Sequence, residues 1–159
     1  MRARRRLSWG VEAMDELAGS LRERLRLSDA VCCGLQLTEH WQDVAEDLAR
    51  GRVYLPAQDM RRFGCTREDL QAPSAEAELR RLMAFEVARA RQLLDQGAPL
   101  IRTLRGRPAL AVAAFVAGGR AALDAIARAG HDVLGTRPRP SRLQRAGSLA
   151  RTLAGARRP

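Results

Sequence analysis

Residues 36 to 56 read Gln-Leu-Thr-Glu-His-Trp-Gln-Asp-Val-Ala-Glu-Asp-Leu-Ala-Arg-Gly-Arg-Val-Tyr-Leu-Pro, and this stretch is the most informative part of the chain. A helix turns about 100° per residue, so acidic positions three or four apart share one sector. That sector contains Glu39, Asp43, Glu46 and Asp47, with Arg50 one turn further on. The opposite side is apolar and contains Leu37, Trp41, Val44 and Leu48. We therefore expect one amphipathic helix whose carboxylates face a cavity or the solvent.

The acidic sector has the composition of a site for a metal-bound diphosphate. Mg²⁺ typically accepts one or two protein carboxylates together with water and phosphate oxygens, which suits Asp43 and Asp47 one turn apart. Arg50 and Arg52 follow directly, and guanidinium groups match phosphate oxygens in pairs. Gly51 between them lets the chain leave the helix. On the residues alone, a solvated acidic helix surface is the alternative interpretation.

Several motifs in a fixed order resemble the second aspartate-rich region of the squalene and phytoene synthase family. They are Leu-Gln-Leu-Thr at 35–38, Asp-Val-Ala-Glu-Asp at 43–47, Arg-Gly-Arg-Val-Tyr-Leu-Pro at 50–56, Phe-Gly at 63–64 and Asp-Leu at 69–70. Trp41 and Gln42 directly before Asp43 resemble the bacterial hydroxysqualene synthase branch of hopanoid biosynthesis. The resemblance implies an all-α fold, an antiparallel helical bundle that corresponds to the C-terminal part of an isoprenoid synthase.

The resemblance also implies a role for individual residues. Asp43 and Asp47 are expected to bind Mg²⁺, which holds the substrate diphosphate and acts as a Lewis acid on the leaving group. The diphosphate is expected to contact Gln36, Arg50, Arg52 and Tyr54, and the last three of these are the expected catalytic residues. Glu39 replaces the asparagine expected in many relatives, so the participation of Glu39 or Glu46 in the metal site stays open.

One part of the family pattern is missing. The first aspartate-rich motif is expected before residue 27, yet residues 1–26 contain no stretch that resembles it. The predicted organisation is a basic segment and amphipathic helix at 1–26, a partial isoprenoid synthase domain at 27–137, and a basic helix and tail at 138–159. The chain is therefore interpreted as a truncated synthase, and its independent activity as an enzyme stays uncertain.

Composition supports a helical chain with a strongly basic balance. Apolar residues make up 46% of the 159 residues and aromatic residues only 4%, which disfavours a base-stacking nucleic-acid surface. All basic residues are arginine, and the formal net charge of +10 favours anionic partners without choosing among them. The three cysteines are expected to be reduced thiols, with Cys32 and Cys33 packed as small apolar residues.

Periodicity and end signals predict the helices. We expect disorder at 1–7, a helix from about 10 to 26, and a new helix capped by Ser28. Further helices are expected near 57–63 ending at Gly64, from Pro73 to Gly97, and from about Arg105 to Gly130. Glu86 lies within the apolar stripe of the second of these helices, and a salt bridge to Arg89 or to an arginine of the metal-site loop is favoured over a metal role.

Two segments of the sequence each allow two interpretations. Gly118 and Gly119 allow close approach either of a neighbouring helix, which we favour, or of a long isoprenoid chain. Residues 141–153 form a basic amphipathic helix that either rests on an anionic membrane or closes the bundle through Leu143, Leu149 and Leu153. We expect no stretch of the chain to be long and apolar enough to span a membrane.

Two classes of function follow. The first is a squalene or hydroxysqualene synthase type of enzyme acting on farnesyl or presqualene diphosphate with Mg²⁺, with a further chain supplying the missing carboxylates. The second is a non-catalytic, arginine-rich helical protein that binds acidic lipid, nucleic acid or a partner subunit, nucleic acid being the least favoured. Either class fits a cytoplasmic protein with peripheral contact at the inner face of the membrane.

Overall fold

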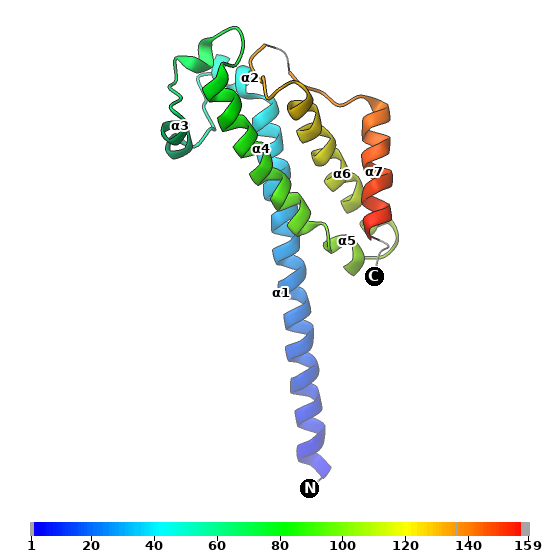
Figure 1. Ribbon diagram of the computed structural model, residues 1–159. Helices are drawn as coiled ribbons and strands as arrows, with labels where there is room; N and C mark the ends of the chain where they lie inside the picture. Colours follow the sequence, from blue (N-terminus) through cyan, green and yellow to red (C-terminus); the bar gives the residue numbers. More distant parts are fainter. Residues whose placement is uncertain (1, 136, 157–159) are drawn as a thin grey trace.

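The structure, a computed structural model, describes the backbone of residues 2–135 and 137–156 and the side chains of these ranges from residue 14 onward. All regular elements in these ranges are helical, as composition and resemblance predicted. The elements are α1 (Arg2–Gln42), α2 (Val44–Ala49), α3 (Ala57–Phe63), the 3₁₀ turn η1 (Asp69–Gln71), α4 (Ala77–Gly97), α5 (Leu100–Thr103), α6 (Gly106–Arg128) and α7 (Arg142–Ala156). The four long helices α1, α4, α6 and α7 alternate in direction and form an antiparallel bundle (Figure 1).

Helix α1 is longer than the sequence predicted. It begins at Arg2 and continues through Ser28 to Gln42, so residues 2–7 are helical and no helix starts at Ser28 (Figure 1). Met1 lies outside the described residues. No proline lies in this span, and Leu27 and Val31 pack against α4 on either side of Ser28, which carries the helix through the expected boundary.

The acidic sector does not lie on one uninterrupted helix. Asp43 has φ −109° and ψ 13°, which ends α1 at Gln42 and starts α2 at Val44. The backbone N–H of Asp43 donates to the carbonyl of Glu39, and that of Asp47 donates to the carbonyl of Asp43. The helical path therefore resumes after one residue, and the predicted single helix is wrong only at this irregular position.

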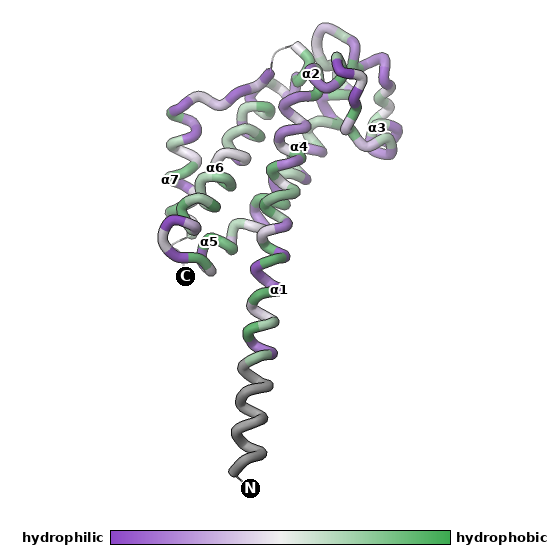
Figure 2. Tube along the Cα trace, turned by 180° about the vertical axis from the view of Figure 1, so that it is seen from behind, coloured by the Kyte–Doolittle hydropathy of each residue, from purple (hydrophilic) through white to green (hydrophobic). Residues whose placement is uncertain are grey.

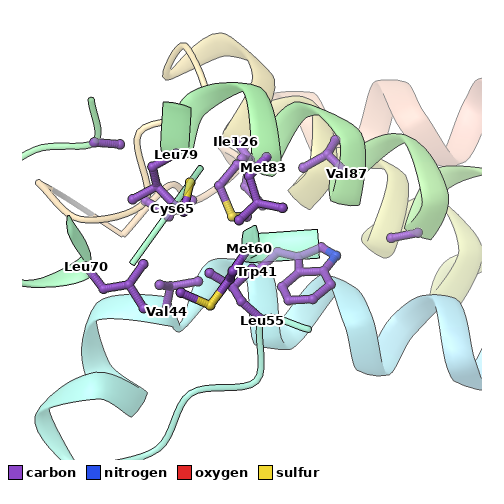
Figure 3. Close-up of a cluster of buried hydrophobic side chains, with 14 of the residues drawn as sticks. Trp41, Val44, Leu55, Met60, Cys65, Leu70, Leu79, Met83, Val87 and Ile126 are labelled. Carbon is purple, nitrogen blue, oxygen red and sulfur yellow. The ribbon is translucent and has the colours of Figure 1, made fainter. Parts of the chain in front are cut away.

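The core lies where the upper part of α1, the segment after α2 and helices α4 and α6 meet (Figure 3). Trp41 and Val44 are buried, and Leu37 and Leu48 pack partly against the same cluster, as the apolar sector predicted. The largest fully buried side chains of α4 and α6 are Leu79, Leu82, Met83, Leu94, Val116, Leu123 and Ile126. Burying these side chains supplies the main driving force for folding.

Three glycines bring the long helices close together. A Cβ atom at Gly97 would lie 2.5 Å from Val31 Cγ2 and 2.8 Å from the backbone oxygen of Leu27. A Cβ atom at Gly34 would lie 2.9 Å from Leu94, and one at Gly119 would lie 2.8 Å from the same side chain. The packing interpretation of Gly119 is therefore confirmed, whereas a Cβ atom at Gly118 would meet nothing within 4 Å.

Local signals predicted the shorter connections well. Helix α3 spans Ala57–Phe63 and ends at Gly64, whose φ of 73° is the left-handed conformation that glycine adopts readily. Thr66 and Asp69 exchange hydrogen bonds at the start of η1, with 2.7 Å between the Thr66 nitrogen and Asp69 Oδ2. These interactions hold the segment between α2 and α4 against the core.

Glu86 is paired as the sequence predicted. Its side chain is only 1% exposed, and Arg89 Nη1 lies 3.4 Å from Glu86 Oε1 and 3.0 Å from Asp59 Oδ2 on α3. Burial raises the pKa of Glu86 to about 7, the Arg89 charge lowers it, and the neighbouring Asp59 carboxyl raises it again. One arginine thus joins two carboxyl groups between α3 and α4.

Helix α7 closes the bundle, which was one of the two predicted alternatives, and Leu149 and Leu153 are half-buried there. Ser148 and Thr152 are buried against α6, and Ser148 Oγ donates a 2.9 Å hydrogen bond to the carbonyl of Ala117. Leu143 is 86% exposed, so it does not pack inward. Small residues face α6 because they let the two backbones approach closely.

Two other expectations need correction. Helix α6 is long and apolar enough to span a membrane by length and composition, contrary to the sequence prediction, and Figure 2 shows it mostly in green. Half of the apolar stretch is nevertheless buried. Cys32 and Cys33 are exposed and are not packed as core residues, because α1 turns them away from α4, whereas Cys65 is buried. Burial raises the pKa of the Cys65 thiol. All three cysteines are free thiols.

Candidate functional site

The candidate site lies where α1 ends, α2 turns and the chain folds back toward Leu55. Gly51 has φ 75°, a left-handed conformation, and this allows a tight return after α2. The carbonyl of Asp47 accepts hydrogen bonds from the backbone nitrogens of Arg50 at 3.0 Å and Arg52 at 2.8 Å. The backbone therefore ties both arginine positions to the second aspartate.

A small pocket brings together three of the six residues predicted from sequence. Its lining includes Asp47, Arg52 and Tyr54, and its floor is formed by core residues that include Trp41 and Leu55. Arg52 and Tyr54 are exposed at its rim, so both side chains are accessible to a ligand. One carboxylate, one guanidinium and one phenol thus share a concave surface, which is a suitable set for a metal-associated anion.

Gln36 belongs to the same site through His40, a residue that was not among the predicted site residues. The rings of His40 and Tyr54 stack with 4.0 Å between their centroids, and Gln36 Nε2 lies 3.1 Å from His40 Nε2. Gln36 and His40 are neighbours because residues four apart lie on one face of a helix. The spacing of residues 36 and 40 is the signal that would have identified His40.

Asp43 lies apart from this pocket and pairs with a residue that the sequence analysis missed. Arg137, in the connection between α6 and α7, forms an ion pair with Asp43 and also lies 3.5 Å from Glu46. Gln42 anchors the same connection by donating a 2.6 Å hydrogen bond to the carbonyl of Pro138. No local signal marked Arg137, since 91 residues separate it from Glu46 and only the tertiary fold brings them together.

The residues present match part of what a divalent cation needs. Asp43 Oδ1 is buried, and it is the oxygen that forms the ion pair with Arg137 Nη2, so a cation bound by Asp43 would compete with this guanidinium group. Asp43 and Asp47 are one turn apart, a spacing that suits Mg²⁺ bound by two carboxylates and phosphate oxygens. Among the residues that the structure describes, no three acidic, histidine or cysteine side chains gather closely enough to hold a metal ion. A cation held by Asp43 and Asp47 would therefore displace Arg137 from Asp43 and take its remaining ligands from a bound diphosphate and water.

The remaining candidates lie at the surface. Arg50 caps α2 through its backbone, and its side chain is exposed. Glu39 is exposed as well, and Glu46 is engaged by Arg137. The structure thus groups Asp47, Arg52, Tyr54, His40 and Gln36 on one side and places Asp43 and Glu46 with Arg137 on the other.

Comparison with known proteins places this site in a known fold. Residues 9–144 match the squalene/phytoene synthase family. The matched range includes residues 9–26, which precede the motifs that carry the resemblance. The phytoene synthase of Thermus thermophilus is 36% identical over 147 residues, which cover 92% of this chain and 50% of that protein.

Two solved structures share the fold. The squalene synthase HpnC from Alicyclobacillus acidocaldarius is 44% identical, with a TM-score of 0.66 over 69% of this chain and 41% of that one. A dehydrosqualene synthase solved in complex with a ligand is 24% identical and supports the fold alone, with a TM-score of 0.68 over 82% of this chain and 44% of that one. The chain spans about half the length of the relatives it matches. Because the family match covers residues 9–144, this chain is a member of the squalene/phytoene synthase family.

Proposed function

We propose that this chain forms one half of a prenyl-diphosphate synthase site and binds the diphosphate of an isoprenoid substrate together with Mg²⁺. The observation that carries the proposal is the shared pocket of Asp47, Arg52 and Tyr54, one helical turn from the Asp43 carboxylate that pairs with Arg137. A cation held by Asp43 and Asp47 would neutralise the diphosphate and polarise it as a leaving group. Arg50, Arg52, Tyr54 and Gln36 are the proposed contacts to the remaining phosphate oxygens.

The proposed substrate class is farnesyl or presqualene diphosphate, and the proposed reaction type is that of a squalene or hydroxysqualene synthase. The 44% identity to the squalene synthase HpnC supports this choice over a phytoene synthase type. Because the chain spans about half the length of these relatives, turnover requires the complementary half of the fold from elsewhere. Binding of the diphosphate group is the part of the function that this chain is proposed to perform by itself.

Titration calorimetry with inorganic pyrophosphate, with and without Mg²⁺, tests the proposal. We expect binding that requires Mg²⁺ and that Asp43→Asn and Asp47→Asn each weaken at least tenfold, since each removes one carboxylate ligand. Asp29→Asn is the matched control, because Asp29 is an exposed aspartate of α1 outside the site. Equal binding with and without Mg²⁺ would contradict the proposal.

A second candidate function rests on the ion pairs of Arg137. Arg137 already neutralises Asp43 and Glu46, so this end of the site is satisfied without any metal. An arginine-rich, non-catalytic protein would then bind anions through its surface charge alone. This alternative predicts pyrophosphate binding that is independent of Mg²⁺, falls steeply with salt and is unchanged in Asp43→Asn.

A further inference from the structure

His40 makes contacts at the candidate site that give it a role of its own. Its ring is half-buried on the last turn of α1, and it lines the same pocket as Asp47, Arg52 and Tyr54. The ring stacks on Tyr54, with 4.0 Å between the centroids and 23° between the planes. Its Nε2 atom lies 3.1 Å from Gln36 Nε2. His40 therefore joins a residue of α1 to one in the segment after α2.

Tyr54 lies in the non-helical segment between α2 and α3, where core and surface residues alternate. Val53 and Leu55 pack against the core, whereas Arg52 and Tyr54 are exposed. Because Tyr54 is 46% exposed, burial does not fix the direction of its ring. A phenol side chain turns about two bonds, so the stack on His40 is the contact that keeps this ring at the pocket.

The two stacked rings are brought together by the residues that follow them in the chain. Trp41 comes directly after His40 and Leu55 directly after Tyr54, and both are buried in one core cluster (Figure 3). The backbone at both rings is therefore held by the core. Gln36 restrains the imidazole further, because a hydrogen bond to a ring nitrogen fixes the orientation of the ring.

The stack determines where the Tyr54 hydroxyl lies relative to Asp47 and Arg52. All three side chains line one pocket, and a phenol O–H donates readily to an anionic oxygen. A group that is held in its bound position before the ligand arrives loses less conformational entropy on binding. Since Tyr54 is exposed at the rim of the pocket, the stack should matter more for ligand binding than for the stability of the bundle.

We propose that His40 is a positioning residue, whose stack holds the Tyr54 phenol at the pocket so that the hydroxyl donates a hydrogen bond to a diphosphate oxygen. Gln36 orients the imidazole, and the imidazole orients the phenol. The effect of His40 on the ligand therefore passes through Tyr54. This inference rests on the proposed diphosphate site and adds a residue to it.

Fluorine NMR tests the stack itself. Tyr54 is the only tyrosine of the chain, so incorporation of meta-fluorotyrosine should give a single resonance, displaced by the ring current of the imidazole. His40→Ala should move this resonance toward its position in the unfolded chain. His131→Asn is the matched control, because His131 is the only other histidine and its φ of 61° is a conformation that asparagine tolerates. A resonance that His40→Ala leaves unchanged would overturn the proposal.

Titration of the full chain with pyrophosphate in the presence of Mg²⁺ tests the consequence for binding. His40→Ala should weaken binding about three- to tenfold, whereas His40→Phe keeps an aromatic face and should stay within about twofold. In a Tyr54→Ala background, His40→Ala should weaken binding no further, because the two residues act in series. Additive losses would show that His40 contacts the ligand directly and would overturn the positioning role. Circular dichroism checks that each variant keeps its helices.

The unchanged chain separates a failure of this role from a failure of the proposed function. If it binds no pyrophosphate in the presence of Mg²⁺, both the diphosphate site and the role of His40 are wrong. If it binds pyrophosphate and His40→Ala binds equally well, only the role of His40 is wrong.

Discussion

Helix α1 contains two stretches of similar sequence character and very different surroundings. Leu27, Val31 and Trp41 in its second half are 1–5% exposed, whereas Met14, Leu21 and Leu25 in its first half are 56–68% exposed. Both stretches have leucines at helical spacing, and both are helical. The difference lies in the neighbours, because α4 and α6 cover only the second half. Equal periodicity therefore indicates an apolar face without telling what covers it.

Truncating one leucine in each half of α1 should give the largest difference in the free energy of unfolding. Leu27→Ala is expected to lower the free energy of unfolding by about 2–4 kcal/mol, because it leaves a cavity beside α4. Leu25→Ala, two residues earlier, should cost less than about 0.5 kcal/mol when both are measured by urea denaturation. Equal losses would show that the first half of α1 is packed within the single chain.

The packed body also contains a buried titrating group, which the projecting half lacks among its described side chains. The pKa of Glu86 is raised to about 7 in the folded protein, so the folded state favours the protonated form. Stability should be highest below the unfolded pKa near 4.5 and should fall as pH rises toward 7, by at most about 3 kcal/mol.

Thermal or urea unfolding between pH 4.5 and 8 measures this effect. Glu86→Gln should remove most of the decline, since a neutral amide fills the same space without ionising. Glu78→Gln is the control, because Glu78 lies on the same helix in an exposed pair with Arg81. An unchanged decline in Glu86→Gln would assign the pH dependence to another group.

Replacing glycine by alanine should change the free energy of unfolding in opposite directions in the packed body and in the projecting half of α1. Gly97→Ala should destabilise the protein by about 1–3 kcal/mol, since the new Cβ atom meets Val31 and the backbone of Leu27. Gly19→Ala in the projecting half has open space around it and should stabilise the helix by up to about 1 kcal/mol. Circular dichroism during urea titration reports both, and a destabilising Gly19→Ala would mean that α1 is not helical there.

A small effect is expected at Trp41, within the packed half. Its indole Nε1 is buried and has no hydrogen-bond partner among the described residues. The desolvation free energy of this N–H group is therefore not offset by a hydrogen bond. Trp41→Phe should therefore change the free energy of unfolding by less than about 1 kcal/mol, because the lost packing and the removed polar group offset each other. A loss as large as that of Leu27→Ala would indicate an acceptor for the indole N–H in solution.

The sequence predicted the elements whose signals are local. Gly64 ends α3 because glycine adopts the left-handed conformation, and Arg89 pairs with Glu86 because residues three apart share a helix face. The opposite placement of Trp41 and the acidic sector followed from helical periodicity in the same way. Each of these depends on residues close together in the chain.

The misplaced features depend on residues far apart. Ser28 was expected to start a helix, yet α1 passes through it, since Leu27 and Val31 on either side pack against Gly97. Arg137 was missed at the candidate site, because the fold and not the spacing brings it to Asp43. The face of α7 was predicted from its leucines, whereas Ser148 and Thr152 fit the close approach to α6.

The order of motifs along the chain was enough to identify the family, the all-helical class and the residues proposed to hold a diphosphate, because these depend on residue type and on spacing within one or two turns. Tertiary structure alone separated Asp43 with Arg137 from the pocket of Asp47, Arg52 and Tyr54, and it alone left half of α1 uncovered. The physical reason is that periodicity determines which side of a helix is apolar, while packing against distant segments determines whether that side is buried.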